Sequence, residues 1–99
     1  MKQYLKTYIT FFGYGETDFM ESELSGNRAV NVHHIDCKGM GGSRLKDTIE
    51  NLMALTFTEH MQYGDKKHYM LFLYTKHIRF IKRHRPDYAI VWDNIPLAY

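Results

Sequence analysis

Apolar and polar residues are arranged along this chain in short blocks, and the pattern within each block predicts a different element. Residues 3–12 are mostly apolar and aromatic, with a spacing that fits a helix or a strand. Residues 16–28 have the composition of a turn-rich connection. Residues 29–35 alternate and contain β-branched side chains, which predicts a strand. The apolar run at residues 52–55 predicts a partner strand, so we expect a small hairpin in mid-chain.

A short helix is predicted directly after the second strand. Thr56 and Glu59 have the spacing of a capping box, in which each side chain bonds a free backbone N–H at the start of a helix. This helix would hold His60 in its first turns and break near Gly64. The predicted order from residue 29 to residue 64 is therefore strand, loop, strand, helix.

A longer, basic helix is predicted over about residues 66–83. Asp65 is expected to cap this helix, and Pro86 would stop it. The residues after Pro86 are rich in apolar side chains and are expected to pack back over the domain. Five apolar positions recur at helical spacing and are expected to face the core: Tyr69, Phe72, Leu73, Phe80 and Ile81.

Composition limits the class of protein. With 99 residues, 44% hydrophobic and 24% charged, residues 1–99 are expected to form one folded domain. No apolar run approaches the ~20 residues that span a bilayer, so no membrane segment is expected. The single cysteine excludes an internal disulfide and any CxxC metal site. Since no signal peptide is recognisable, we expect an intracellular, cytoplasmic protein, virus-encoded proteins included.

Charge is distributed unevenly along the chain. Residues 66–85 carry seven Lys or Arg and no Asp or Glu, so with a net charge of +2 the remaining residues sum to −5. Such segregation suits an anionic partner, and nucleic acid is favoured over a membrane because no continuous apolar face accompanies the charge. Lys66 and Lys67 are candidate phosphate contacts. The alternative is an ordinary solvated helix face.

Three histidines form the candidate chemical centre. His33 and His34 close the first predicted strand, and His60 lies on the short helix. Alternation sends neighbouring strand residues to opposite faces, so the pair can serve one site only where the strand ends. The functional interpretation is a phosphodiesterase site in which His33 and His60 ligate one metal and His34 is the general base. Asn51 would hold the loop or the His34 ring; the alternative for these histidines is surface polarity.

The combined pattern resembles the HNH endonuclease family. The resemblance covers residues of about 20–68 and consists of four pieces in order: Val32 to Ile35, Gly39 to Gly42, Glu50 to Leu55, and Glu59 with His60. It implies an α+β domain with a ββα-metal core, also called a His-Me finger, at about residues 29–64. An N-terminal element and a C-terminal helix would be added to that core. It also implies metal-dependent hydrolysis of DNA.

The resemblance assigns roles residue by residue. His33 and His60 would bind one divalent ion (Mg, Mn, Ni or Zn), His34 would be the general base, and Asn51 would orient the site. Many relatives also hold a structural zinc through two CxxC pairs, but residues 22–26 and 56–60 contain no cysteine. No structural zinc is therefore expected, and packing would have to supply that stability. A third metal ligand found in some relatives falls on Gly64.

Two functions are compatible with this pattern. The first is a DNA endonuclease that nicks or is weakly sequence-specific, since 99 residues leave no room for a separate sequence-reading module. High specificity would then need a homodimer or a protein partner. The alternative is an inactive HNH-derived module that binds nucleic acid or protein. In either case the loop cations Lys38, Arg44 and Lys46 would contact flanking phosphates, unless they serve solubility alone.

Overall fold

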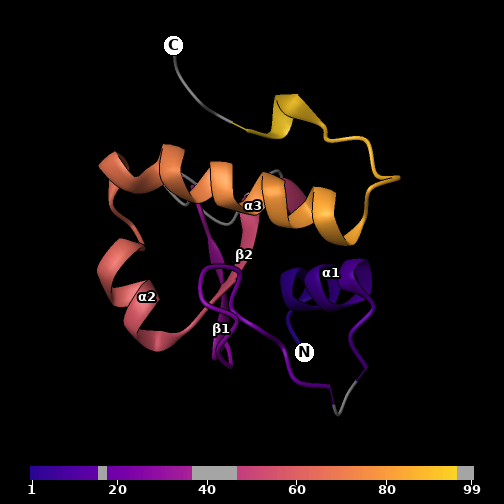
Figure 1. Ribbon diagram of the computed structural model, residues 1–99, viewed down its shortest axis with the longest axis horizontal. Helices are drawn as coiled ribbons and strands as arrows, with labels where there is room; N and C mark the ends of the chain where they lie inside the picture. Colours follow the sequence, from indigo (N-terminus) through magenta and orange to yellow (C-terminus); the bar gives the residue numbers. More distant parts are fainter. Residues whose placement is uncertain (16–17, 37–46, 96–99) are drawn as a thin grey trace.

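A computed structural model describes residues 1–15, 18–36 and 47–95. These residues form a small mixed α+β domain around a two-stranded antiparallel sheet (Figure 1). Three α-helices surround the sheet in the described part of the chain. The elements are α1 (Gln3–Phe12), β1 (Asn31–His34), β2 (Leu52–Leu55), α2 (Phe57–Tyr63) and α3 (Met70–His84).

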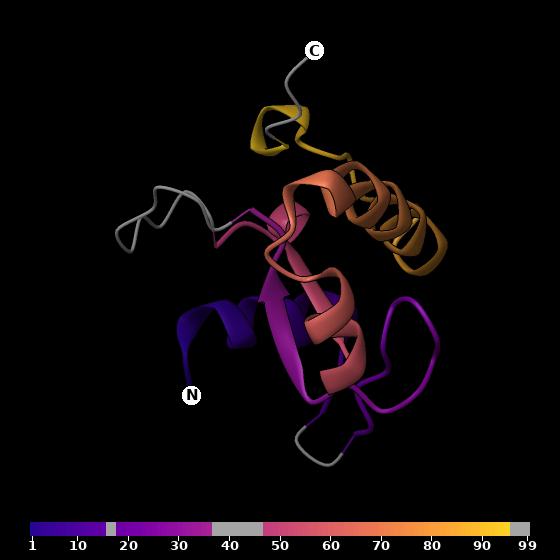
Figure 2. The ribbon, with the colours of Figure 1, turned by 90° about the vertical axis from the view of Figure 1, so that its left-hand side faces the viewer.

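The hairpin separates two apolar clusters. In its register His33 pairs with Met53 and His34 pairs with Leu52. Leu52 faces the cluster that contains Tyr8 of α1, whereas Met53 faces the cluster that contains Leu73 of α3. Accordingly, α1 and α2 lie on opposite faces of the sheet (Figure 2). Side chains that alternate along β1 and β2 are therefore sent to two different environments.

The first element is a helix, which the apolar pattern alone left open. The Tyr8 side chain is fully buried against the sheet. The helix ends at Gly13, whose left-handed backbone (φ 74°) lets its N–H bond the carbonyls of Ile9 and Thr10. The spacing of apolar residues fits a helix or a strand equally well. The helix forms here because it buries one of its faces against β2.

The predicted hairpin partner and the capped helix are both present. The Thr56 hydroxyl accepts from the Glu59 backbone N–H at 3.1 Å, and the Glu59 carboxylate accepts from the Thr56 backbone N–H at 2.9 Å. This is the capping box that the sequence predicts. The helix ends at Gly64, whose N–H bonds the His60 carbonyl at 2.8 Å.

The prediction for the basic helix was wrong at its start. The chain first makes a short 3₁₀ turn, η3 (Lys67–Tyr69), and α3 begins at Met70 without a side-chain cap. Asp65 instead occupies a left-handed turn (φ 59°) between α2 and η3, so it does not cap the helix. Of the five expected core positions, Leu73, Phe80 and Ile81 are buried; Tyr69 is half-buried and Phe72 is exposed.

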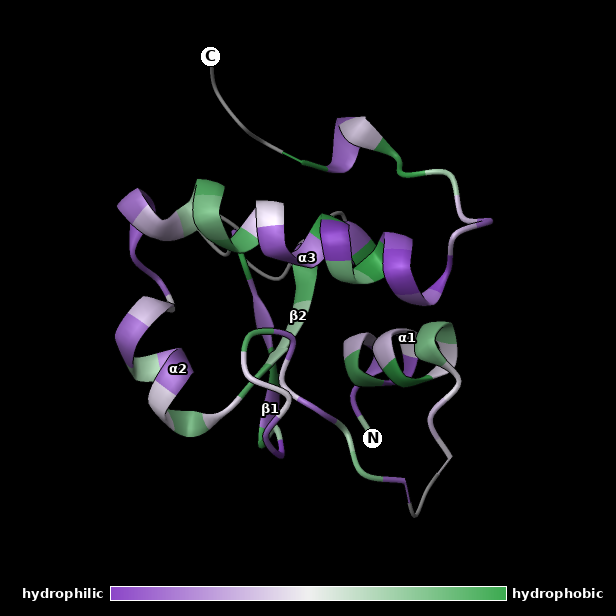
Figure 3. Ribbon diagram, in the orientation of Figure 1, coloured by the Kyte–Doolittle hydropathy of each residue, from purple (hydrophilic) through white to green (hydrophobic). Residues whose placement is uncertain are grey.

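Helix α3 lies across the end of the hairpin (Figure 1). Along α3, hydrophilic and hydrophobic residues alternate, whereas β2 is hydrophobic throughout (Figure 3). The chain after α3 is anchored by Glu50, whose carboxylate accepts from the Tyr88 hydroxyl and from the Val91 N–H. No helix in the described ranges has both the length and the apolar content that crossing a bilayer requires.

Candidate functional site

His33 of β1 and His60 of α2 lie side by side. Their ring centroids are 4.8 Å apart at an interplanar angle of 82°. Two ring nitrogens, His33 Nε2 and His60 Nδ1, are buried and have no hydrogen-bond partner within the described residues. A buried polar atom without a partner is costly, by about 1–3 kcal/mol. Within the described residues, these two nitrogens are therefore the atoms of the site that could accept a bond from a ligand.

Gly64 leaves the space beside these two rings. A Cβ at this position would lie 3.2 Å from His60 Nδ1 and 3.3 Å from His33 Cε1, and only 2.5 Å from the His60 carbonyl oxygen. The backbone of Gly64 has an ordinary φ of −68°, which any residue adopts. Glycine is thus required here by space and not by conformation. Any side chain at position 64 would crowd the unpaired nitrogen of His60.

The electrostatics keep His33 neutral. Burial is the main cause that lowers the pKa of His33 to about 4, and the neighbouring His60 lowers it further. Asp65 acts in the opposite direction and does not compensate. At neutral pH the His33 ring therefore carries a free lone pair on one nitrogen. This is the protonation state that metal ligation requires.

The donor set of this centre consists of two imidazoles. Within the described ranges, no group of three or more His, Cys, Asp or Glu side chains is placed to hold a metal. Two imidazole ligands suit Zn or Ni, whereas Mg and Mn prefer oxygen ligands. The buried unpaired nitrogens and the space at Gly64 fit such an ion, with other ligands completing its coordination.

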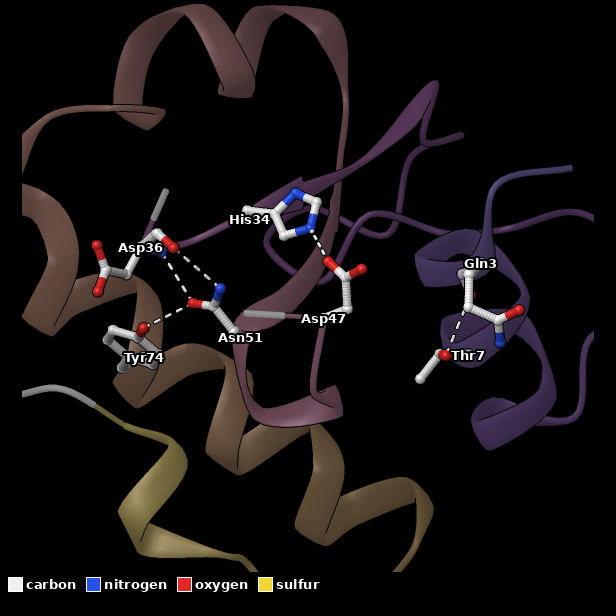
Figure 4. A network of polar contacts seen from close by, with 7 residues as sticks. All are labelled: Gln3, Thr7, His34, Asp36, Asp47, Asn51 and Tyr74. Atoms are coloured by element: carbon white, nitrogen blue, oxygen red, sulfur yellow. Dashed lines mark hydrogen bonds and ion pairs between the residues drawn. The ribbon is translucent and has the colours of Figure 1, made fainter. Parts of the chain in front are cut away.

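His34 lies on the other face of β1. Its Nε2 is 2.7 Å from the Asp47 carboxylate (Figure 4), and its ring meets the edge of the Tyr4 ring with centroids 4.6 Å apart. One quarter of the His34 side chain is exposed. The alternation of β1 thus separates His34 from His33. The structure brings together two of the three candidate histidines and places the third across the strand.

Asn51 is buried and fastens the chain where β1 ends. Its Oδ1 accepts from the Asp36 backbone N–H at 2.8 Å, and its Nδ2 donates to the Asp36 carbonyl at 3.0 Å. The Tyr74 hydroxyl also donates to Oδ1 at 2.7 Å (Figure 4). The bonds to Asp36 fit the first of the two roles that the sequence left open, in which Asn51 holds the start of the loop.

The candidate phosphate contacts are only partly described. The Lys66 ammonium donates to the Met61 carbonyl at 2.7 Å, beside the end of α2. Lys67 is exposed. Both residues follow Gly64 directly and so lie in the segment that leaves the histidine pair. The three loop cations, Lys38, Arg44 and Lys46, lie outside the described residues.

Hydrogen bonds join the segment around Ser22 to the start of α2, the two segments in which the sequence analysis expected no structural zinc. The Ser22 hydroxyl donates to the Glu59 carboxylate at 2.5 Å and accepts from the backbone N–H of Leu24 at 3.1 Å. Burial raises the pKa of Glu59, but hydrogen bonds from Ser22, Ser25 and Thr56 outweigh it and lower the pKa overall. Polar contacts, in addition to packing, therefore connect these segments. The sequence analysis missed this contribution.

A second buried histidine has a different environment. His77 of α3 is fully buried, with Nδ1 2.6 Å from the Glu23 carboxylate and Nε2 2.6 Å from the Ile49 carbonyl. The Tyr8 hydroxyl donates to the same carboxylate at 2.5 Å. Burial lowers the pKa of His77, but Glu23 and the Ile49 carbonyl outweigh it and raise the pKa overall. The sequence indicated a partly buried, bonded ring and did not indicate Glu23.

No family model, curated protein or solved structure matches this chain. The site must therefore be interpreted from its own geometry. That geometry consists of a two-histidine centre on one face of β1 and a bonded, partly exposed histidine on the other. Two residues that the sequence analysis missed, Tyr4 and Asp47, contact His34, and nothing in their local sequence pattern could have identified them.

Proposed function

We propose that this chain is a metal-dependent DNA endonuclease with a ββα-metal core formed by β1, β2 and α2. The observation that carries the proposal is the pair of buried, unpaired nitrogens His33 Nε2 and His60 Nδ1 beside Gly64. A divalent cation bound by these rings would satisfy both atoms. The order of strand, loop, strand and capped helix supports the same interpretation.

Each histidine has a separate task in this proposal. His33 and His60 would hold the ion, and the low pKa of His33 keeps its ring neutral for that purpose. When bound, the ion supplies a Lewis acid that stabilises negative charge on the phosphate oxygens. His34 takes a proton from water: the water O–H bond breaks, an N–H bond forms, and the hydroxide oxygen attacks phosphorus. The P–O bond to the leaving group breaks, and its electron pair stays on the leaving oxygen, which takes a proton from solvent.

The exposed cations of α3 supply affinity for DNA. Lys76, Arg79, Lys82 and Arg83 are exposed and form no ion pair within the described residues. Together with Lys66 and Lys67, they would contact phosphates without reading sequence. Binding would therefore be salt-dependent and weakly specific. A homodimer or a protein partner would be needed for higher specificity.

A second function has one observation in its favour. His34 and the His33–His60 pair lie on opposite faces of β1, so one phosphate can reach both only around the end of the strand. If DNA does not reach both, the chain would be an HNH-derived module that binds nucleic acid or protein without cutting. Binding would then survive the removal of metal.

Plasmid nicking separates these two functions. Supercoiled plasmid is incubated with the protein and Mg²⁺, Mn²⁺, Ni²⁺ or Zn²⁺, in parallel with the variants His33→Ala and His34→Ala. The matched control is His68→Ala, which removes an exposed histidine outside the site. We expect metal-dependent nicking that falls about 10²–10⁴-fold in His34→Ala, which lacks the general base. His33→Ala should lose it as well, while His68→Ala keeps it.

Equal background cleavage in all four proteins would overturn the nuclease proposal. A gel shift in chelator then tests the alternative. Binding that strengthens as salt is lowered, with no cleavage under any metal, would favour the binding module.

A further inference from the structure

The His34 ring is held by two residues from outside the hairpin. Asp47 follows the glycine-rich loop, and its Oδ1 lies 2.7 Å from His34 Nε2. Tyr4 belongs to the first turn of α1, and its ring meets the His34 ring with centroids 4.6 Å apart and an interplanar angle of 62°. Three segments that are distant in the sequence therefore meet at this one side chain. Figure 4 shows the contact with Asp47.

The contact with Asp47 determines what each ring nitrogen can do. An ionised carboxylate only accepts hydrogen bonds, so His34 Nε2 must carry the proton that joins them. A neutral imidazole has one N–H, which leaves Nδ1 with the lone pair. Within the described residues, Nδ1 is bonded to no other side chain, and one quarter of the His34 side chain is exposed. Nδ1 is thus the nitrogen available to a water molecule.

We infer that Asp47 and Tyr4 are positioning residues for His34. Asp47 holds the ring as the Nε2–H tautomer with the lone pair on Nδ1, and the Tyr4 ring limits its rotation. Helix α1 is then part of the site, in addition to packing against the sheet. The role in catalysis rests on the proposed function of His34 as a base, but the tautomer and the orientation can be measured without metal or DNA.

Nuclear magnetic resonance of the metal-free protein tests the tautomer directly. Ring ¹⁵N shifts of His34 are measured about two pH units above the ordinary histidine pKa of about 6.5, where a free ring is neutral. We expect a nearly pure Nε2–H form in the wild type and in Asp47→Asn, whose amide oxygen still accepts. Asp47→Ala should give a measurable share of the Nδ1–H form. The His68 ring in the same spectra is the control and should not change.

Identical His34 shifts in the wild type and in Asp47→Ala would overturn the inference, as would an Nδ1–H form in the wild type. Tyr4 is tested by the pair Tyr4→Phe and Tyr4→Ala. The first keeps the ring and should leave the His34 side-chain signals in place. The second should broaden or shift them, because the ring can then rotate. Signals unchanged in Tyr4→Ala would remove Tyr4 from the proposal.

Nicking kinetics then connect positioning to the reaction. We expect Asp47→Ala to lower kcat about 10–100-fold, the size of effect seen when the hydrogen-bond partner of a metal-binding histidine is removed. The KM for plasmid should stay close to that of the wild type, because Asp47 does not contact DNA in this scheme. Asp47→Asn should recover most of kcat. A KM effect without a kcat effect would contradict the positioning role.

The two proposals fail in different ways. If the wild type does not nick plasmid under any metal, the nuclease proposal fails, while the ring shifts still decide whether Asp47 fixes the tautomer. If the wild type nicks and Asp47→Ala nicks equally well, the positioning proposal fails alone. Circular dichroism of each variant confirms that it is folded before either result is used.

Discussion

Three histidines of the described chain have buried ring nitrogens, and they differ in whether those nitrogens have hydrogen-bond partners. His77, on α3, bonds Glu23 through one nitrogen and the Ile49 carbonyl through the other. His33 and His60 each keep one buried nitrogen that bonds nothing in the described part of the chain. The same side chain therefore stabilises the fold in one place and remains available for a ligand in the other.

The difference shows how burial should be interpreted for a polar side chain. A buried ring whose two nitrogens both have partners is accounted for by the fold, and its removal leaves other groups unpaired. A buried nitrogen without a partner forms no hydrogen bond that stabilises the metal-free protein, so the arrangement of His33 and His60 calls for another explanation. The proposed metal binding would supply one. The following experiments test the contrast.

The largest effect is expected from His77→Leu. The substitution removes the partner of a buried carboxylate, and breaking a buried pair in this way typically lowers the free energy of unfolding by about 3–5 kcal/mol. Urea unfolding followed by circular dichroism measures it. The double variant His77→Leu with Glu23→Gln should recover part of the loss, because it removes the uncompensated charge. A loss below about 1 kcal/mol would mean that the His77–Glu23 pair does not hold the fold.

Metal should stabilise the protein through the other group. Zn²⁺ or Ni²⁺ at about 100 times its dissociation constant should raise the free energy of unfolding by about 2.7 kcal/mol. His33→Leu should abolish this increment, while His68→Ala retains it. Without metal, His33→Leu should be close to the wild type in stability or slightly above it, since no hydrogen bond is lost. Equal stabilisation of the wild type and His33→Leu would show that the ion binds elsewhere.

Gly64→Ala should have an intermediate effect. The added Cβ would approach the His60 carbonyl oxygen to 2.5 Å, so the backbone must shift. Overpacking of this kind costs about 1–3 kcal/mol of folding stability. It should also weaken metal binding, measured by calorimetric titration. The control is Gly15→Ala, whose Cβ would meet only the flexible Asp18 side chain at 3.2 Å; metal affinity there should equal that of the wild type.

The smallest expected effects are changes in the free energy of unfolding with pH, at most about 1.4 kcal/mol per pH unit for one group. The effects of His77 and His33 have opposite signs. The pKa of His77 is raised, so the stability it contributes is complete below about pH 6.5, the value in the unfolded chain, and is lost as pH rises through the folded pKa. The pKa of His33 is lowered to about 4, so its contribution is complete above about pH 6.5 and is lost as pH falls toward 4.

Urea unfolding in chelator across this pH range measures both slopes. The alkaline slope should disappear in His77→Leu, and part of the acid slope should disappear in His33→Leu. If the alkaline slope persists unchanged in His77→Leu, His77 is not the group that loses its proton there.

The hairpin and the capped helix were predictable because their signals are local. The apolar run at β2 and the capping box of Thr56 and Glu59 each act within a few residues. The start of α3 was not predictable, because Asp65 takes a left-handed turn set by how α2 meets η3. The contact between His33 and His60 follows from packing α2 on one face of the hairpin. The position of His34 relative to them depends on where β1 ends.

The sequence by itself determined the α+β composition, the strand that carries two adjacent histidines, and the helix that carries the third. Only the tertiary structure decided that α1 is a helix, that Tyr4 and Asp47 hold His34, and that Glu23 pairs with His77. The physical reason is the distance along the sequence over which each interaction acts. Capping and alternation act between neighbours, whereas the partners of His77 and His34 lie 54 and 13 residues away and meet only when the hairpin folds between its helices.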